Sequence, residues 1–143
     1  MTLTAKEYLR QLRRIDRQLE LLFKERTELE RAQTYMRSPQ AEGDRVQTSP
    51  SGDPPWMGYL IKWEELTAKI GKEWDTLIDL KHIITDQIKR LPDERHIKLL
   101  GMRYVDYKSF EQIAVEMGYS FEYTLKLHGR ALMAFTEMYK YVL

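Results

Sequence analysis

The stretch that decides the fold runs from Leu91 to Leu132 and reads LPDERHIKLLGMRYVD, then YKSFEQIAVEMGYS, then FEYTLKLHGRAL. Its pattern predicts three short helices joined by tight turns. Pro92 suits the start of the first helix, and Asp93 and Glu94 are favourable in its first turn because acidic side chains complement the positive end of a helix.

The last two of these helices are predicted to form a helix-turn-helix. Ser109 lies three residues before Gln112, which is a capping-box spacing, so the second helix should begin there. Gly118 supplies the left-handed residue that the turn needs, and Ser120 is a good N-cap for the third helix. A helix-turn-helix commonly places its second helix in a DNA major groove.

These residues resemble a known family. Leu91-Pro92-Asp93-Glu94-Arg95, then Arg103-Tyr104, then Ser109-Phe110-Glu111-Gln112-Ile113-Ala114 resemble region four of bacterial sigma factors, and Leu127-His128-Gly129-Arg130-Ala131-Leu132 is similar to the end of that family's recognition helix. The resemblance covers roughly the last third of the chain. The layout of the whole chain resembles phage-encoded regulators of the RinA and ArpU kind, and related phage proteins with no settled function.

Composition favours a charged, helical protein of the cytoplasm. The chain has 143 residues, a net charge of +1 and no cysteine, so disulfides and thiolate zinc sites are excluded. No run of about 18 apolar residues predicts a membrane span, and the N-terminus has no apolar signal core. We expect a location in the cytoplasm of a bacterial host cell, with no membrane partner.

The charge of the C-terminal third is balanced. From Pro92 onward there are seven basic and seven acidic side chains. DNA affinity grows with the number of cations placed on phosphates, so a single copy of this part should bind DNA weakly. A second copy of the chain or a partner protein is therefore expected.

The first 91 residues predict two long helices. Residues 4–36 and 56–91 carry apolar residues at heptad spacing, with Arg26, Thr67 and Lys81 as polar breaks. Residues 38–55 hold four of the five prolines and predict a flexible loop. Trp74 is expected in the second seam, and Gly71 beside it suggests close approach to the first helix.

The predicted fold is therefore all-α, a long antiparallel helical hairpin over residues 1–91 followed by a small helix-turn-helix domain over residues 92–143. We expect the two seams to support self-association, as a homo-oligomer. Enzymatic chemistry finds no support in the sequence. His82, His96 and His128 have no metal-ligand spacing, no glycine-rich nucleotide loop is present, and no cofactor is expected. His128 is more simply explained by packing.

The third helix carries the candidate DNA-binding residues. With Thr124, Leu127, Ala131 and Phe135 inward, helical geometry turns the opposite face outward. The resemblance implies that Phe121, Glu122, Leu125 and Lys126 lie at base-reading positions. Arg130, Ser109 and Ser120 complete the predicted DNA-binding set, and Arg130 and Ser109 suit phosphates.

The resemblance implies a phage-type, sequence-specific transcriptional regulator that binds double-stranded DNA near a promoter, together with RNA polymerase. The chain lacks a counterpart of the promoter-opening domains of a sigma factor. Phe121 and Leu125 also stand where sigma factors often carry polar or basic residues, which leaves an alternative open: an assembly adaptor whose helix-turn-helix docks protein. A cluster of Lys108, Lys126, Arg130 and Lys140 would favour the regulator, and acids around Lys126 would favour the adaptor.

Overall fold

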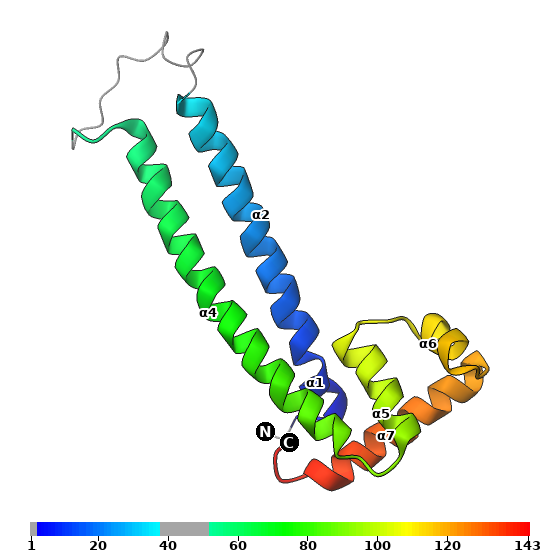
Figure 1. Ribbon diagram of the computed structural model, residues 1–143. Coiled ribbons are helices and arrows are strands. Elements are labelled where there is room, and N and C mark those ends of the chain that lie inside the picture. Colours follow the sequence, from blue (N-terminus) through cyan, green and yellow to red (C-terminus); the bar gives the residue numbers. More distant parts are fainter. Residues whose placement is uncertain (1–2, 38–51) are drawn as a thin grey trace. The chain divides into compact units, whose positions relative to one another are not determined.

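The computed structural model describes residues 3–37 and 52–143, and within these ranges it is helical with no strand. The predicted all-α class is confirmed. The elements in chain order are α1 (Ala5–Leu9), α2 (Gln11–Arg37), α4 (Pro55–Lys89), α5 (Glu94–Leu100), the π-helical turn η1 (Gly101–Val105), α6 (Phe110–Met117) and α7 (Phe121–Tyr139) (Figure 1). Most of the predicted loop, residues 38–51, lies outside the described residues, and Pro55 already begins α4.

The chain forms two compact units. The first unit comprises residues 1–16 and 76–143, and the second comprises residues 17–75. These units do not coincide with the predicted division at Leu91 and Pro92, because the beginning of the chain and the end of α4 group with the C-terminal helices. Independent folding of residues 92–143 stays a prediction.

The N-terminal helix is interrupted, where the sequence predicted a continuous one. Thr4 and Glu7 form a capping box that starts α1, and α1 ends at Leu9. Arg10 separates α1 from α2, although its N–H still donates to the Lys6 carbonyl at 3.0 Å. No glycine or proline marks this break. The break comes directly after the buried residues Tyr8 and Leu9. We therefore relate it to the packing of these side chains and not to a helix-breaking residue.

Within the second unit, α2 and α4 run side by side (Figure 1), and their polar seam positions meet. Arg26 donates a hydrogen bond to the Thr67 hydroxyl at 3.3 Å, and the Trp63 indole N–H donates to the Glu30 carboxylate at 2.8 Å. Two of the three predicted polar breaks, Arg26 and Thr67, therefore satisfy each other. Polar pairs within an apolar seam are known to fix the register of paired helices.

Two predictions about α4 are wrong. Trp74 is 47% exposed rather than packed in the seam, and Leu66, which the heptad count passed over, is buried in the same unit. Gly71 does not mark a close approach, because a Cβ placed there would meet no atom within 4 Å. The heptad template assigned Trp74 to a seam from periodicity alone, and periodicity does not specify how wide the buried stripe is.

The end of α4 packs into the first unit. The helix ends at Lys89, two residues earlier than predicted, and Leu91 follows in a turn in which its N–H donates to the Ile88 carbonyl at 3.1 Å. Seam residues of this part are buried in a single chain: Leu77, Ile84, Ile88 and Leu91. These four side chains are therefore not available for contact with a second copy of the chain. Self-association through the two seams stays a prediction.

The C-terminal helices build the rest of the first unit. Asp93 is the N-cap of α5, not a first-turn residue as predicted, and it accepts from the Arg95 N–H at 2.9 Å. The sequence did not predict η1, and α7 is 19 residues long rather than short. The fully buried large side chains from these helices are Leu99, Leu100, Ile113, Leu127 and Phe135.

The start of the chain joins this core. The Tyr8 ring lies 6.0 Å from the Phe135 ring, centroid to centroid, and its hydroxyl donates to the Gln87 side chain at 2.7 Å. Tyr139 donates to the Gln87 backbone carbonyl at 2.8 Å. These contacts place α1 against the C-terminal half of α7. None of the described helices is long and apolar enough to cross a membrane.

Candidate nucleic-acid interface

The connection between α6 and α7 has the local geometry that the sequence predicted. The Ser109 hydroxyl accepts from the Gln112 N–H at 3.2 Å, and the Ser120 hydroxyl accepts from the Tyr123 N–H at 3.1 Å. Gly118 ends α6 in the left-handed region, at φ 74° and ψ 29°. Ser109 therefore fixes where α6 begins, and Gly118 and Ser120 fix where α6 ends and α7 begins.

The two faces of α7 differ as the helical phase predicted. Thr124, Leu127, Ala131 and Phe135 are fully buried. All the candidate side chains of α7 are exposed: Phe121, Glu122, Leu125, Lys126 and Arg130. Gly129 lies on the same outer face, where a Cβ would meet no atom within 4 Å, so this surface is open along α7.

Three charged side chains on the outer face of α7 have no partner among the described residues. The side chains of Glu122, Lys126 and Arg130 take part in no hydrogen bond or ion pair there. By contrast, Lys108 pairs with Glu116 at 2.8 Å, and Lys140 pairs with Glu137 at 3.5 Å. Of the four cations singled out by sequence, two are thus neutralised by local acids. The two without a described acidic partner are those on the candidate face.

Arg95 ties the start of α5 to the start of α7. Its guanidinium donates to the Asp93 carboxylate at 3.0 Å and to the Tyr123 hydroxyl at 2.9 Å. The hydrogen bonds from Arg95 lower the pKa of Asp93 to about 2. Tyr123 in turn lies edge-on to Tyr119 at 4.9 Å between ring centroids. Arg95 is therefore committed to holding α7 in place rather than free to bind phosphate.

His128 is part of a buried cluster behind the exposed face, as its predicted packing role requires. Its Nε2 lies 2.7 Å from the Tyr104 hydroxyl, and its ring lies edge-on to Phe110 at 4.8 Å between centroids. Burial, followed by the positive charges of Lys6, Arg103 and Arg10, lowers the pKa of His128 to about 4. The cluster is therefore neutral near pH 7 and links η1, α6 and α7.

Arg103 supports the same cluster. Its guanidinium lies 4.2 Å from the centroid of the Phe110 ring and donates to the Lys108 backbone carbonyl at 3.0 Å. A cation over an aromatic face, with a hydrogen bond to the loop before α6, fixes the approach to Ser109. Arg103, one of the residues that carries the sigma-factor resemblance, thus has a structural role here.

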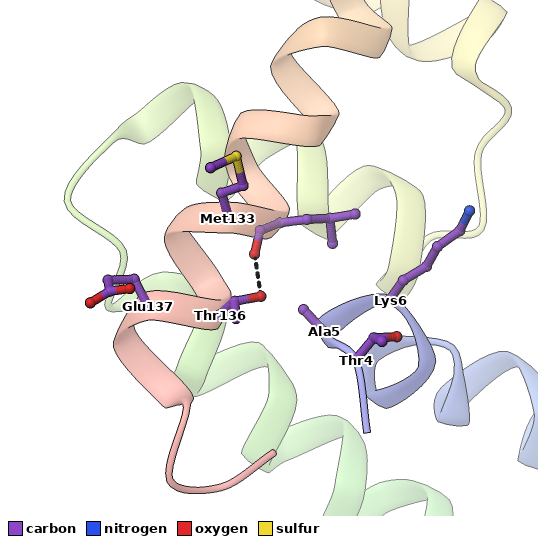
Figure 2. A pocket seen from close by; sticks show the side chains of 7 residues that line it. Thr4, Ala5, Lys6, Met133, Thr136 and Glu137 are labelled. Atoms are coloured by element: carbon purple, nitrogen blue, oxygen red, sulfur yellow. Dashed lines mark hydrogen bonds between the residues drawn. The ribbon is translucent and has the colours of Figure 1, made fainter. Parts of the chain in front are cut away.

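An open groove lies between α1 and α7 (Figure 2). It is lined mainly by apolar surface, from Thr4, Ala5, Lys6, Leu132, Met133, Thr136 and Glu137. The Thr136 hydroxyl is occupied, because it donates to the Leu132 carbonyl at 2.8 Å. In Figure 2 the Lys6 side chain points away from Met133 and Glu137. The groove is therefore mainly apolar, and Lys6 is the cation that lines it.

Sequence reasoning missed the contribution of the N-terminus. Counted by folded unit, the first unit has 14 basic and 11 acidic side chains, a net charge of +3, whereas residues 92–143 alone are neutral. The i, i+4 spacing of Lys6 and Arg10 was visible in the sequence. Their position beside His128 was not, because it depends on packing between segments more than 100 residues apart.

Comparison with known proteins places this chain in no family. No family model matches the chain, and no curated protein or solved structure shows significant similarity to it. In the part of the chain that the structure describes, no three His, Cys, Asp or Glu side chains are grouped as a metal site.

Proposed function

We propose that this chain is a sequence-specific DNA-binding transcriptional regulator of phage type, which acts near a promoter together with RNA polymerase. In this proposal the chain is a helical hairpin followed by a helix-turn-helix, with α6 as its first helix and α7 as its recognition helix. The resemblance of residues 91–132 to region four of sigma factors supports it. The double-stranded DNA would lie against the outer face of α7.

The observation that carries the proposal is the state of this outer face. Glu122 and Lys126 are exposed and free of partners within the described chain, one helical turn apart. An acid and a base at i, i+4 on a helix surface can form a stabilising ion pair. Here neither charge is used internally, while the opposite face of α7 is fully buried and both ends of the α6–α7 turn are capped.

Each exposed side chain suits a particular contact in the major groove. Lys126 can donate to guanine O6 and N7, Glu122 can accept from cytosine N4, and Leu125 can contact a thymine methyl. Arg130, one turn further along α7, suits a backbone phosphate, and Ser109 and Ser120 suit phosphates at the starts of α6 and α7.

A second function is favoured by the apolar character of the same region. Phe121 is 44% exposed, Leu125 40%, Met133 74% and Val115 81%. Where exposed apolar side chains form one contiguous patch, they are typical of protein interfaces. In this alternative the α6–α7 surface docks a protein, as an assembly adaptor would.

The test begins with the full-length protein and a selection of bound duplexes from random DNA. Lys126→Ala should then weaken binding to the preferred site by about 1–3 kcal/mol and relax the choice of base beneath it. Arg130→Ala is the matched comparison, and it should weaken all sequences alike because phosphates carry no sequence information. If Lys126→Ala leaves DNA affinity and base preference unchanged, the regulator proposal is wrong and the docking alternative gains.

A further inference from the structure

We propose that Lys6, Arg10 and Arg13 form a phosphate-binding stripe, the N-terminal basic stripe, which extends the DNA interface of α6 and α7 along the DNA backbone. This inference rests on the proposed function, since it names the part of the chain that supplies much of the affinity. It assigns a binding role to α1 and the start of α2, which lie outside the stretch that resembles sigma factors.

The three cations follow one side of a helical path. Lys6 and Arg10 are one turn apart, and the Arg10 N–H donates to the Lys6 carbonyl at 3.0 Å. Arg13 is three residues further on, near the start of α2. Lys6 and Arg10 share the face of α1 because a helical hydrogen bond joins them, and Arg13 follows one turn after Arg10 in α2, so the three cations succeed one another along the chain across the break at Arg10.

This line runs beside the elements of the candidate interface. The charges of Lys6 and Arg10 act on the buried His128 of α7, and the charge of Arg10 also acts on Tyr104 of η1. The Arg13 guanidinium lies 5.9 Å from the centroid of the Tyr107 ring. Tyr107 comes two residues before Ser109, the N-cap of α6. The stripe thus borders α7, η1 and the loop that leads into α6.

The loop at the end of the stripe is held in an unusual conformation. Tyr107 has a φ of 59°, the one positive value for a residue other than glycine among the described residues. A residue other than glycine keeps such a conformation only when its surroundings hold it. The Arg13 guanidinium of α2 lies over the Tyr107 ring, and burial, followed by the Asp16 carboxylate, raises the pKa of Tyr107. The start of α2 therefore lies beside the loop that leads into α6.

The nearby acids do not neutralise the stripe. The Glu7 carboxylate accepts from the Thr4 N–H at 2.9 Å in the capping box, and Asp16 forms no ion pair with any residue that the structure describes. Lys6 and Arg10 are exposed, and neither forms an ion pair with any residue that the structure describes. Exposed, unpaired cations in a row are what a regularly spaced line of phosphates requires, because each one placed on a phosphate releases a counterion.

The experiment compares full-length variants by binding to two duplexes, the site selected by the wild-type protein and an unrelated sequence, over a series of salt concentrations. The test variant carries Lys6→Gln and Arg10→Gln. The control carries Lys81→Gln and Lys89→Gln, which remove the same charge from exposed positions of α4. Helical content and thermal unfolding are measured for both variants, so that loss of fold is recognised.

If the stripe binds phosphates, the test variant should lose affinity for both duplexes alike, by roughly fivefold to tenfold for each contact at about 0.1 M salt. The slope of log K against log salt concentration should be smaller in magnitude by about 2. The control variant should change affinity less than about twofold, and Lys126→Ala should affect the selected site more than the unrelated one. If the test variant matches the control while Lys126→Ala still impairs the selected site, the stripe is wrong and the proposed function stands. If wild-type protein binds neither duplex, both fail.

Discussion

Acidification should destabilise the protein through His128. The imidazole is 9% exposed and shares a hydrogen bond with the Tyr104 hydroxyl, and Lys6, Arg10 and Arg103 place positive charge around it. Its pKa is lowered from 6.5 to about 4, so between these values the unfolded chain binds a proton that the folded chain does not. The stabilising contribution is therefore complete above about pH 6.5 and is lost as the pH falls towards 4.

The size of this effect follows from the two pKa values. With a His128 pKa of 6.5 in the unfolded chain and about 4 in the folded chain, the free energy of unfolding falls by about 2 kcal/mol between pH 7 and pH 5. By pH 4 the loss is about 3 kcal/mol. The assay is urea unfolding followed by circular dichroism at each pH. His128→Gln is the reference variant, because glutamine can still bond the Tyr104 hydroxyl but does not titrate.

The difference between wild type and this reference isolates the single proton. Wild-type protein should lose about 2 kcal/mol more than His128→Gln between pH 7 and pH 5. If the two unfolding free energies stay parallel over that range, His128 is not held neutral by its surroundings, and the account of the cluster is refuted.

Three further predictions concern stability and are read from chemical denaturation. Leu127→Ala should destabilise the fold by about 2–5 kcal/mol through a core cavity, because the Leu127 side chain is fully buried. A loss below about 1 kcal/mol would contradict the assigned face of α7. Gly71→Ala should stabilise the protein by up to about 1 kcal/mol, since a Cβ there meets no atom within 4 Å. Gly118→Ala should instead destabilise it, because Gly118 has a φ of 74°. Equal effects of the two substitutions would refute the turn geometry. Ser120→Ala should cost about 0.5–2 kcal/mol through loss of the hydrogen bond to the Tyr123 N–H, and an unchanged stability would show that this cap is dispensable.

Much of the C-terminal fold follows from local sequence. Ser109, Gly118 and Ser120 each act through their own backbone neighbourhood, so the boundaries of α6 and α7 could be predicted. The phase of α7 followed from the spacing of Leu127 and Ala131, which also fixed which candidate residues face outward.

What the sequence did not predict depends on contacts between distant segments. The left-handed Tyr107 contacts Arg13 of α2, and the helix breaks at Arg10, although neither residue type marks such a conformation. The exposure of Trp74 depends on how α4 meets α2, which heptad spacing does not determine. The charge count from Pro92 onward did not include Lys6 and Arg10 of the proposed N-terminal basic stripe, because the packing of this segment on α7 is not visible in the sequence.

The most direct test of the central proposal, that α7 contacts DNA bases, is site-specific photo-crosslinking from Leu125. A photoreactive phenylalanine derivative replaces Leu125, which is 40% exposed on the candidate face, or Ile83 of α4, which is 48% exposed and serves as the control. The full-length protein is irradiated with its selected duplex and with bacterial RNA polymerase. The proposal predicts a crosslink from position 125 to a base inside the selected site, and none from position 83. Crosslinking of position 125 to protein alone, or equal crosslinking of DNA from both positions, would contradict it.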